Sequence, residues 1–128
     1  FLLIICLSAE LCSSLRILGV FPIGAKSHFV MTSRLMKELS ARGHQVDIIN
    51  VFPQKKPIPN YRDIVVKDPN IPEVSNNVTY EDVQKFMSIS MEVFAKMAGN
   101  RVCEHLKHPA MRDIIENKKG AYDVIVVE

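Results

Sequence analysis

A strand–helix–strand pattern near the amino end limits this chain to a small set of folds. The apolar run Arg16–Phe21 predicts a short buried strand, which Pro22 ends. Gln45–Phe52 is rich in β-branched residues and predicts the next strand, which ends at Pro53. A helix between these segments would make a βαβ unit, in which parallel strands are joined by a right-handed crossover. The chain is therefore expected to be an α/β protein.

The helix of this unit has a recognisable start and end. Ser27 is the expected N-cap, and Gly43 is the expected stop at the carboxyl end. Between them, apolar residues recur at helical spacing and predict the face that packs on the sheet. These residues are Met31, Leu35 and Leu39.

The remainder of the chain predicts a long connection, two helices and a final strand. Residues 53–77 are rich in proline, and within them only Asp63–Lys67 is expected to pair as a strand. Thr79 and Asp82 resemble a capping box, which would open a helix that runs to about Gly99. The last predicted elements are a helix over Pro109–Asn117 and a strand over Tyr122–Val127. This order predicts a Rossmann-like parallel sheet with helices on both faces and ligands at the carboxyl ends of its strands.

The composition indicates a globular domain and argues against nucleic-acid binding. Hydrophobic residues make up 48% of the 128 residues and charged residues 23%, which is typical of a globular domain. The 16 basic and 14 acidic residues form no long run of one sign, so nucleic-acid binding is not expected.

The amino end predicts a secretory route. Residues 1–14 consist of the apolar run Phe1–Leu7 and a mostly small-residue stretch, so we expect a signal peptide whose first residues are lost. A buried first strand is the alternative. Asn77 begins an Asn-Val-Thr triplet that fits N-glycosylation, which agrees with secretion. The folded domain would then span residues 15–128, with Cys103 as its one cysteine.

His28 is the residue best placed for chemistry. It lies in the first turn of the predicted helix, directly after the carboxyl end of a strand, and it shares the predicted apolar face. The partial positive charge of a helix amino terminus disfavours imidazolium, so a neutral ring could act as a general base. The alternative is a histidine that only packs at a helix start.

Other motifs carry weaker signals. Gly19 to Lys26 nearly spells a phosphate-binding loop, but Ala25 breaks the spacing and Gly19 falls inside a strand. His105 and His108 have no companion ligand at a suitable spacing, so no metal site is predicted. One helix carries adaptable apolar side chains that could line a ligand site, although core packing is the favoured interpretation. They are Phe86, Met87, Met91, Phe94 and Met97.

Two segments together resemble a known family. RILGVFPIGAKSHFVMTSRLMKELSARGHQVDIINVFP, with its Ser27-His28-Phe29 triplet and Arg42-Gly43-His44 helix exit, is similar to the start of mature UDP-glycosyltransferases of the UDP-glucuronosyltransferase type, particularly in insects. YDVIVVE resembles a later strand of the same family. The resemblance implies an incomplete amino-terminal, acceptor-binding domain of a two-domain GT-B glycosyltransferase. It also implies transfer of a sugar from a UDP-sugar to a small lipophilic acceptor with inversion, a role in detoxification, and an endoplasmic-reticulum address.

The resemblance also assigns roles to residues. His28 matches the catalytic base, and Glu128 matches the carboxylate that orients it, unless that partner lies just beyond Glu128. Acceptor contacts would come from Phe29, Phe86, Met87 and Phe94. The donor site would lie in a carboxy-terminal domain that a membrane anchor follows, so the fragment alone is expected to be inactive. The resemblance implies no metal or other cofactor. The rival hypothesis is a secreted, non-enzymatic α/β module that binds apolar ligands.

Overall fold

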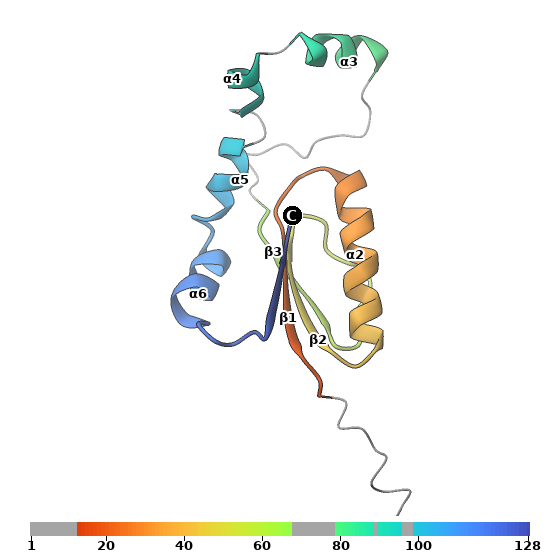
Figure 1. Ribbon diagram of the computed structural model, residues 1–128, viewed down its shortest axis with the longest axis vertical. Coiled ribbons are helices and arrows are strands. Elements are labelled where there is room, and N and C mark those ends of the chain that lie inside the picture. Colours follow the sequence, from red (N-terminus) through yellow and green to blue (C-terminus); the bar gives the residue numbers. More distant parts are fainter. Residues whose placement is uncertain (1–12, 68–78, 89, 96–98) are drawn as a thin grey trace, which may run out of the picture.

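The computed structural model describes residues 13–67, 79–88, 90–95 and 99–128. Within these ranges, four parallel strands form one sheet in the order β3-β2-β1-β4 (Figure 1). The strands are β1 (Arg16–Phe21), β2 (Gln45–Asn50), β3 (Tyr61–Val65) and β4 (Val124–Val127). Residues 1–12 of the expected signal peptide and the expected glycosylation site at Asn77 lie outside the described residues.

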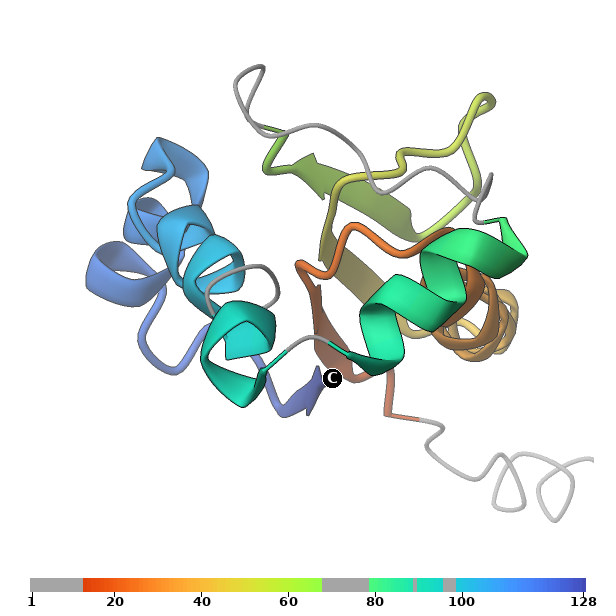
Figure 2. The same cartoon turned by 90° about the horizontal axis from the view of Figure 1, so that it is seen from above.

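The Rossmann-like α/β class predicted from the sequence is confirmed. Helix α2 (Lys26–Ala41) covers one face of the sheet, and α6 (Pro109–Asn117) lies on the other (Figure 2). Strand β1 is central, because it pairs with β2 on one side and with β4 on the other. The predicted bounds of β1 are correct. The third strand begins two residues earlier than expected, and β4 begins two residues later.

The α2 face of the sheet is closely packed. Phe29 and Met36 are 3% and 0% exposed, and they join a core cluster with Ile17, Phe21, Val46 and Ile48. Two serines share this helical face, and their small side chains let the helix approach the strands. Ser33 and Ser40 are buried, and each hydroxyl donates a hydrogen bond to a backbone carbonyl three residues earlier.

This packing corrects the expected orientation of α2. Met31 and Leu35 were expected to face the sheet, but they are 73% and 51% exposed. The helix carries apolar residues on two sides, and the side that includes the small serines is the one that is buried. The start also differs, because Ala25 occupies the N-cap position and Ser27 lies inside the first turn. The predicted end at Gly43 is correct, since this glycine has a φ of 92°.

Helix α6 covers the opposite face of the sheet. Pro109 is the first residue of the helix, and His108 caps it by accepting a hydrogen bond from the Ala110 N–H at Nδ1, 3.2 Å away. Met111 is 7% exposed and packs with Leu18, Ile49, Val51 and Val66 in a second core cluster. The sheet is therefore buried on both faces where these two helices cover it.

The long helix expected after Thr79 is instead divided into α3 (Tyr80–Met87), α4 (Met91–Phe94) and α5 (Asn100–His105). The capping box at its start is confirmed, because Thr79 N–H donates to Asp82 and Asp82 N–H donates back to Thr79 Oγ1. Directly after α3, the Ser88 hydroxyl donates to the Lys85 carbonyl at 2.7 Å. Both α3 and α4 lie beyond the carboxyl edge of the sheet (Figure 1). In the part of the chain that the structure describes, no helix has the length and apolar character needed to cross a membrane.

Replacing Gly19 with alanine tests the close approach of α2 to β1. An added Cβ would lie 2.7 Å from Met36 Cε and 2.6 Å from Phe21 Cε2, so these side chains would have to shift. We expect Gly19→Ala to lower the free energy of unfolding by about 1–3 kcal/mol in urea titrations. Gly99→Ala is the control, because its Cβ would meet nothing within 4 Å. Equal unfolding midpoints for the two variants would contradict the close packing.

Candidate functional site

The first turn of α2 and the end of β4 meet at the carboxyl edge of the sheet. Because β1 and β4 are parallel neighbours, the chain leaves β1 and enters α2 at the same edge where β4 ends. The meeting brings His28 and Glu128, which are 100 residues apart, into direct contact. His28 Nδ1 lies 2.6 Å from Glu128 Oε1.

The geometry of this contact assigns the histidine proton. An ionised carboxylate only accepts hydrogen bonds, so Nδ1 carries the hydrogen and donates it to Glu128. The neutral ring then has its lone pair on Nε2. The His28 side chain is 54% exposed and that of Glu128 is 24% exposed, so the pair lies at the surface where a small molecule can reach the ring.

An aromatic cluster underlies this corner of the sheet. Phe29 and Phe52 have ring centroids 5.7 Å apart. The Lys26 ammonium lies 4.7 Å from the centroid of Phe52 and 5.4 Å from that of Phe29, which is cation–π geometry. Phe29 was expected to contact an acceptor, but only 3% of it is exposed and it belongs to the core. Its role in the structure is to anchor the helical turn that carries His28.

The other apolar candidates lie on α3 and α4. Met87 and Met91 are 85% and 80% exposed, so the favoured interpretation of these two residues as core is wrong. Phe86 belongs to α3 and Phe94 to α4, and the structure describes the backbone of these two residues but not their side chains. Tyr80 is also 76% exposed, which gives these short helices an apolar surface beyond the carboxyl edge of the sheet.

The weaker motifs have structural explanations. Gly19 lies inside β1, as the sequence indicated, so its amide belongs to the sheet and not to a phosphate-binding loop. His105 is 7% exposed and His108 caps α6. Among residues 13–67, 79–88, 90–95 and 99–128, no three His, Cys, Asp or Glu side chains gather in a way that could hold a metal.

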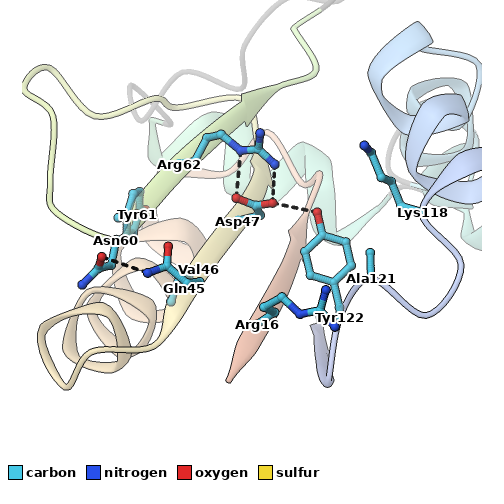
Figure 3. Close-up of a pocket in the computed structure, with 10 residues that line it drawn as sticks. All are labelled: Arg16, Gln45, Val46, Asp47, Asn60, Tyr61, Arg62, Lys118, Ala121 and Tyr122. Carbon is cyan, nitrogen blue, oxygen red and sulfur yellow. Dashed lines mark hydrogen bonds and ion pairs between the residues drawn. The ribbon is translucent and has the colours of Figure 1, made fainter. Parts of the chain in front are cut away.

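A second polar site lies at the opposite, amino-terminal edge of the sheet. It is a cavity of about 580 Å³ with Arg16, Arg62 and Lys118 on its walls. Figure 3 shows Asp47 between the guanidinium of Arg62 and the hydroxyl of Tyr122. Arg62 Nε donates to Asp47 Oδ1 at 2.8 Å, and the Tyr122 hydroxyl donates to Asp47 Oδ2 at 2.7 Å. No sequence pattern indicated this network, because Tyr122 lies 75 residues from Asp47.

A parallel α/β sheet with a histidine–carboxylate pair at its carboxyl edge defines a Rossmann-like domain with a candidate general base. The sequence is 34% identical over 84 residues to UDP-glycosyltransferase UGT5 of Dactylopius coccus, covering 66% of this chain and 15% of that protein. It is 30% identical over 114 residues to UDP-glucosyltransferase 2 of the same organism, covering 87% of this chain and 21% of that protein. The resemblance to UDP-glycosyltransferases is therefore confirmed, and the sheet is consistent with the GT-B fold.

The similarity covers most of this chain but only a small part of each relative. The chain spans about a fifth or less of the length of these curated relatives. No protein-family profile matches the chain, and no solved structure matches it.

The Asp47–Tyr122 contact predicts a distinct alkaline titration. Burial, with a smaller contribution from Asp47, raises the pKa of Tyr122 from 10.0 to about 12. The pKa of Tyr122 is higher in the folded state than in the unfolded state. The stability that this tyrosine contributes is therefore complete below about pH 10 and is lost as the pH rises toward about 12. Asp47→Asn should lower the pKa of Tyr122 but leave it above 10.0, since burial remains.

Phenolate absorbance measures this titration, and Tyr122→Phe identifies which of the three tyrosines is responsible. An ordinary tyrosine pKa for Tyr122 in the folded protein would contradict its burial, and an unchanged pKa in Asp47→Asn would show that the contact with Asp47 does not form.

Proposed function

We propose that this chain is the amino-terminal, acceptor-binding part of a UDP-glycosyltransferase, and that His28 is its general base. The observation that carries the proposal is the contact of 2.6 Å between His28 Nδ1 and Glu128 Oε1. The contact fixes the tautomer that presents a basic nitrogen, as in other histidine–carboxylate pairs. The similarity to two UDP-sugar transferases supplies the class of reaction.

The proposed reaction is a single displacement. His28 Nε2 accepts the proton of the acceptor hydroxyl as the acceptor oxygen forms a bond to the anomeric carbon of the sugar. The bond between that carbon and the UDP oxygen breaks, and UDP leaves from the opposite face. One displacement on a base-activated nucleophile inverts the anomeric configuration. Glu128 stabilises the imidazolium that forms, because its carboxylate remains on Nδ1.

The proposed acceptor is a small lipophilic molecule with a hydroxyl group. The surface around the carboxyl edge supports this choice, because Tyr80, Met87 and Met91 of α3 and α4 are exposed apolar side chains. Met side chains are flexible and polarisable, so they suit ligands of varied shape. Phe86 and Phe94 complete the set of acceptor contacts in this proposal, while Phe29 supports the site from the core.

The remaining parts of the proposal concern the rest of the enzyme. The UDP-sugar, a hexosyl or glucuronosyl donor, would be bound mainly by a carboxy-terminal domain. Residues 1–14 would direct the protein to the endoplasmic reticulum, where Asn77 would carry a glycan and residues 15–128 would form the partial domain. A membrane anchor would follow the carboxy-terminal domain, and the lumenal enzyme would act in detoxification.

Replacing His28 with alanine in the natural protein that contains this chain tests its role. We expect kcat to fall by roughly 10²- to 10⁴-fold, because a positioned general base contributes about that much. Met31→Ala is the matched control, since Met31 lies on the same helix and is 73% exposed. Acceptor binding should persist in His28→Ala. Unchanged turnover would show that His28 is not the base, whereas acceptor binding without turnover in the unsubstituted protein would favour the rival hypothesis of a non-enzymatic binding module.

The chain of 128 residues should not turn over a UDP-sugar by itself. It spans 21% of the relative that it matches over the longer segment, and in this proposal the donor is bound mainly by a carboxy-terminal domain. Release of UDP can be followed with the purified chain and a panel of hydroxylated lipophilic acceptors. Turnover above the uncatalysed background would show that the donor site lies within these residues.

A further inference from the structure

Strand β4 is weakly held by its own side chains. It is four residues long, it lies at the edge of the sheet, and β1 is the strand with which it pairs. Val124, Ile125 and Val127 are 40%, 59% and 68% exposed. Burial sets the register of a strand only where one face is clearly buried, so the apolar residues of β4 provide little discrimination between alternative registers.

Two polar anchors precede the strand and fix its start. Asp123 Oδ2 accepts a hydrogen bond from the Arg16 backbone N–H at 2.7 Å, and the Asp123 N–H donates to the Arg16 carbonyl at 2.8 Å. The Tyr122 hydroxyl donates to Asp47 of β2, which the Arg62 guanidinium of β3 holds in place. These contacts tie the residues before β4 to all three of the other strands.

The anchored register places Glu128 on the correct face of the sheet. Val124 pairs with Ile17 and Val127 with Val20, and the Glu128 N–H donates to the Val20 carbonyl at 3.3 Å. Val126 packs against the core cluster under α2, and Glu128 projects to the same face because strand side chains alternate. A shift of one residue would turn Glu128 to the α6 face, away from His28.

We propose that Tyr122 and Asp123 are positioning residues that set the register of β4 and thereby hold Glu128 against His28. The inference deepens the proposed function and rests on it. It connects the polar network at the amino-terminal edge of the sheet with the histidine at the carboxyl edge through one short strand. The network lining the cavity acts through Glu128 and does not itself contact the reacting groups.

The ring nitrogens of His28 provide the test, because their ¹⁵N chemical shifts report which nitrogen carries the hydrogen. The measurement uses the whole chain, and the His28→Ala spectrum identifies the His28 signals among the four histidines. In the unsubstituted chain we expect the Nδ1–H tautomer that Glu128 selects. Glu128→Ala should remove this preference. Tyr122→Phe should lower the ratio of the Nδ1–H to the Nε2–H tautomer about fivefold, the effect of losing one hydrogen bond.

Asp123 variants provide a second, independent arm. Asp123→Ala should lower the same ratio, while Asp123→Asn should largely restore it, because the amide oxygen can still accept the Arg16 N–H. Tyr80→Phe is the matched control, since Tyr80 is 76% exposed on α3 and should leave the ratio unchanged. If Tyr122→Phe unfolds the chain, the Asp123 pair still decides the question.

The outcomes separate this inference from the proposed function. An unchanged tautomer ratio in Tyr122→Phe and Asp123→Ala, with a changed ratio in Glu128→Ala, overturns the positioning role and leaves His28 paired with Glu128. An unchanged ratio in Glu128→Ala overturns the positioning role because the pair itself is not formed. The role of His28 as base is decided separately, by turnover in His28→Ala.

Discussion

The parallel pairing of β1 with both β2 and β4 is the constraint on which the rest of the structure depends. This pairing brings the end of β4 to the edge where β1 ends and α2 begins, although β4 comes after every other element in the sequence. Helices α2 and α6 then bury the two faces of the same sheet. A histidine in the first turn of α2 and a glutamate directly after β4 meet because of this topology, and no local interaction would bring them together.

Close packing between α2 and β1 holds the first turn of α2, which carries His28, in place. Gly19, Ser33 and Ser40 remove side-chain volume between β1 and α2, so Met36 and Phe29 can fill the space below the helix. Phe29 is adjacent to His28 and fixes the first turn by its burial against Phe52. The candidate base is therefore exposed at a point where the backbone beneath it is well anchored. This combination suits a group that must keep its direction while it exchanges a proton.

The sequence predicted the elements of the fold better than their faces and contacts. The apolar run of β1 and the glycine after α2 were sufficient to locate those elements, because strand burial and a positive φ leave clear local signals. Met31 and Leu35 were wrongly predicted to face the sheet, since they are more apolar than the serines that in fact pack on it, whereas Leu39 does pack against the core. The sequence pattern did not predict the division into α3, α4 and α5. His28 and Glu128 were paired only through the family resemblance, and the Tyr122–Asp47 contact left no trace in the sequence, because such contacts exist only after the sheet has formed.

A structure of the natural protein with a bound acceptor analogue is the direct test of His28 as the base. We expect the acceptor hydroxyl to lie about 2.6–3.2 Å from His28 Nε2, within reach of proton transfer, while Glu128 remains on Nδ1. The anomeric carbon of the donor should lie on the far side of that hydroxyl. A complex in which the acceptor hydroxyl contacts a different base, or in which His28 Nε2 is turned into the protein, would contradict the role of His28 as the base.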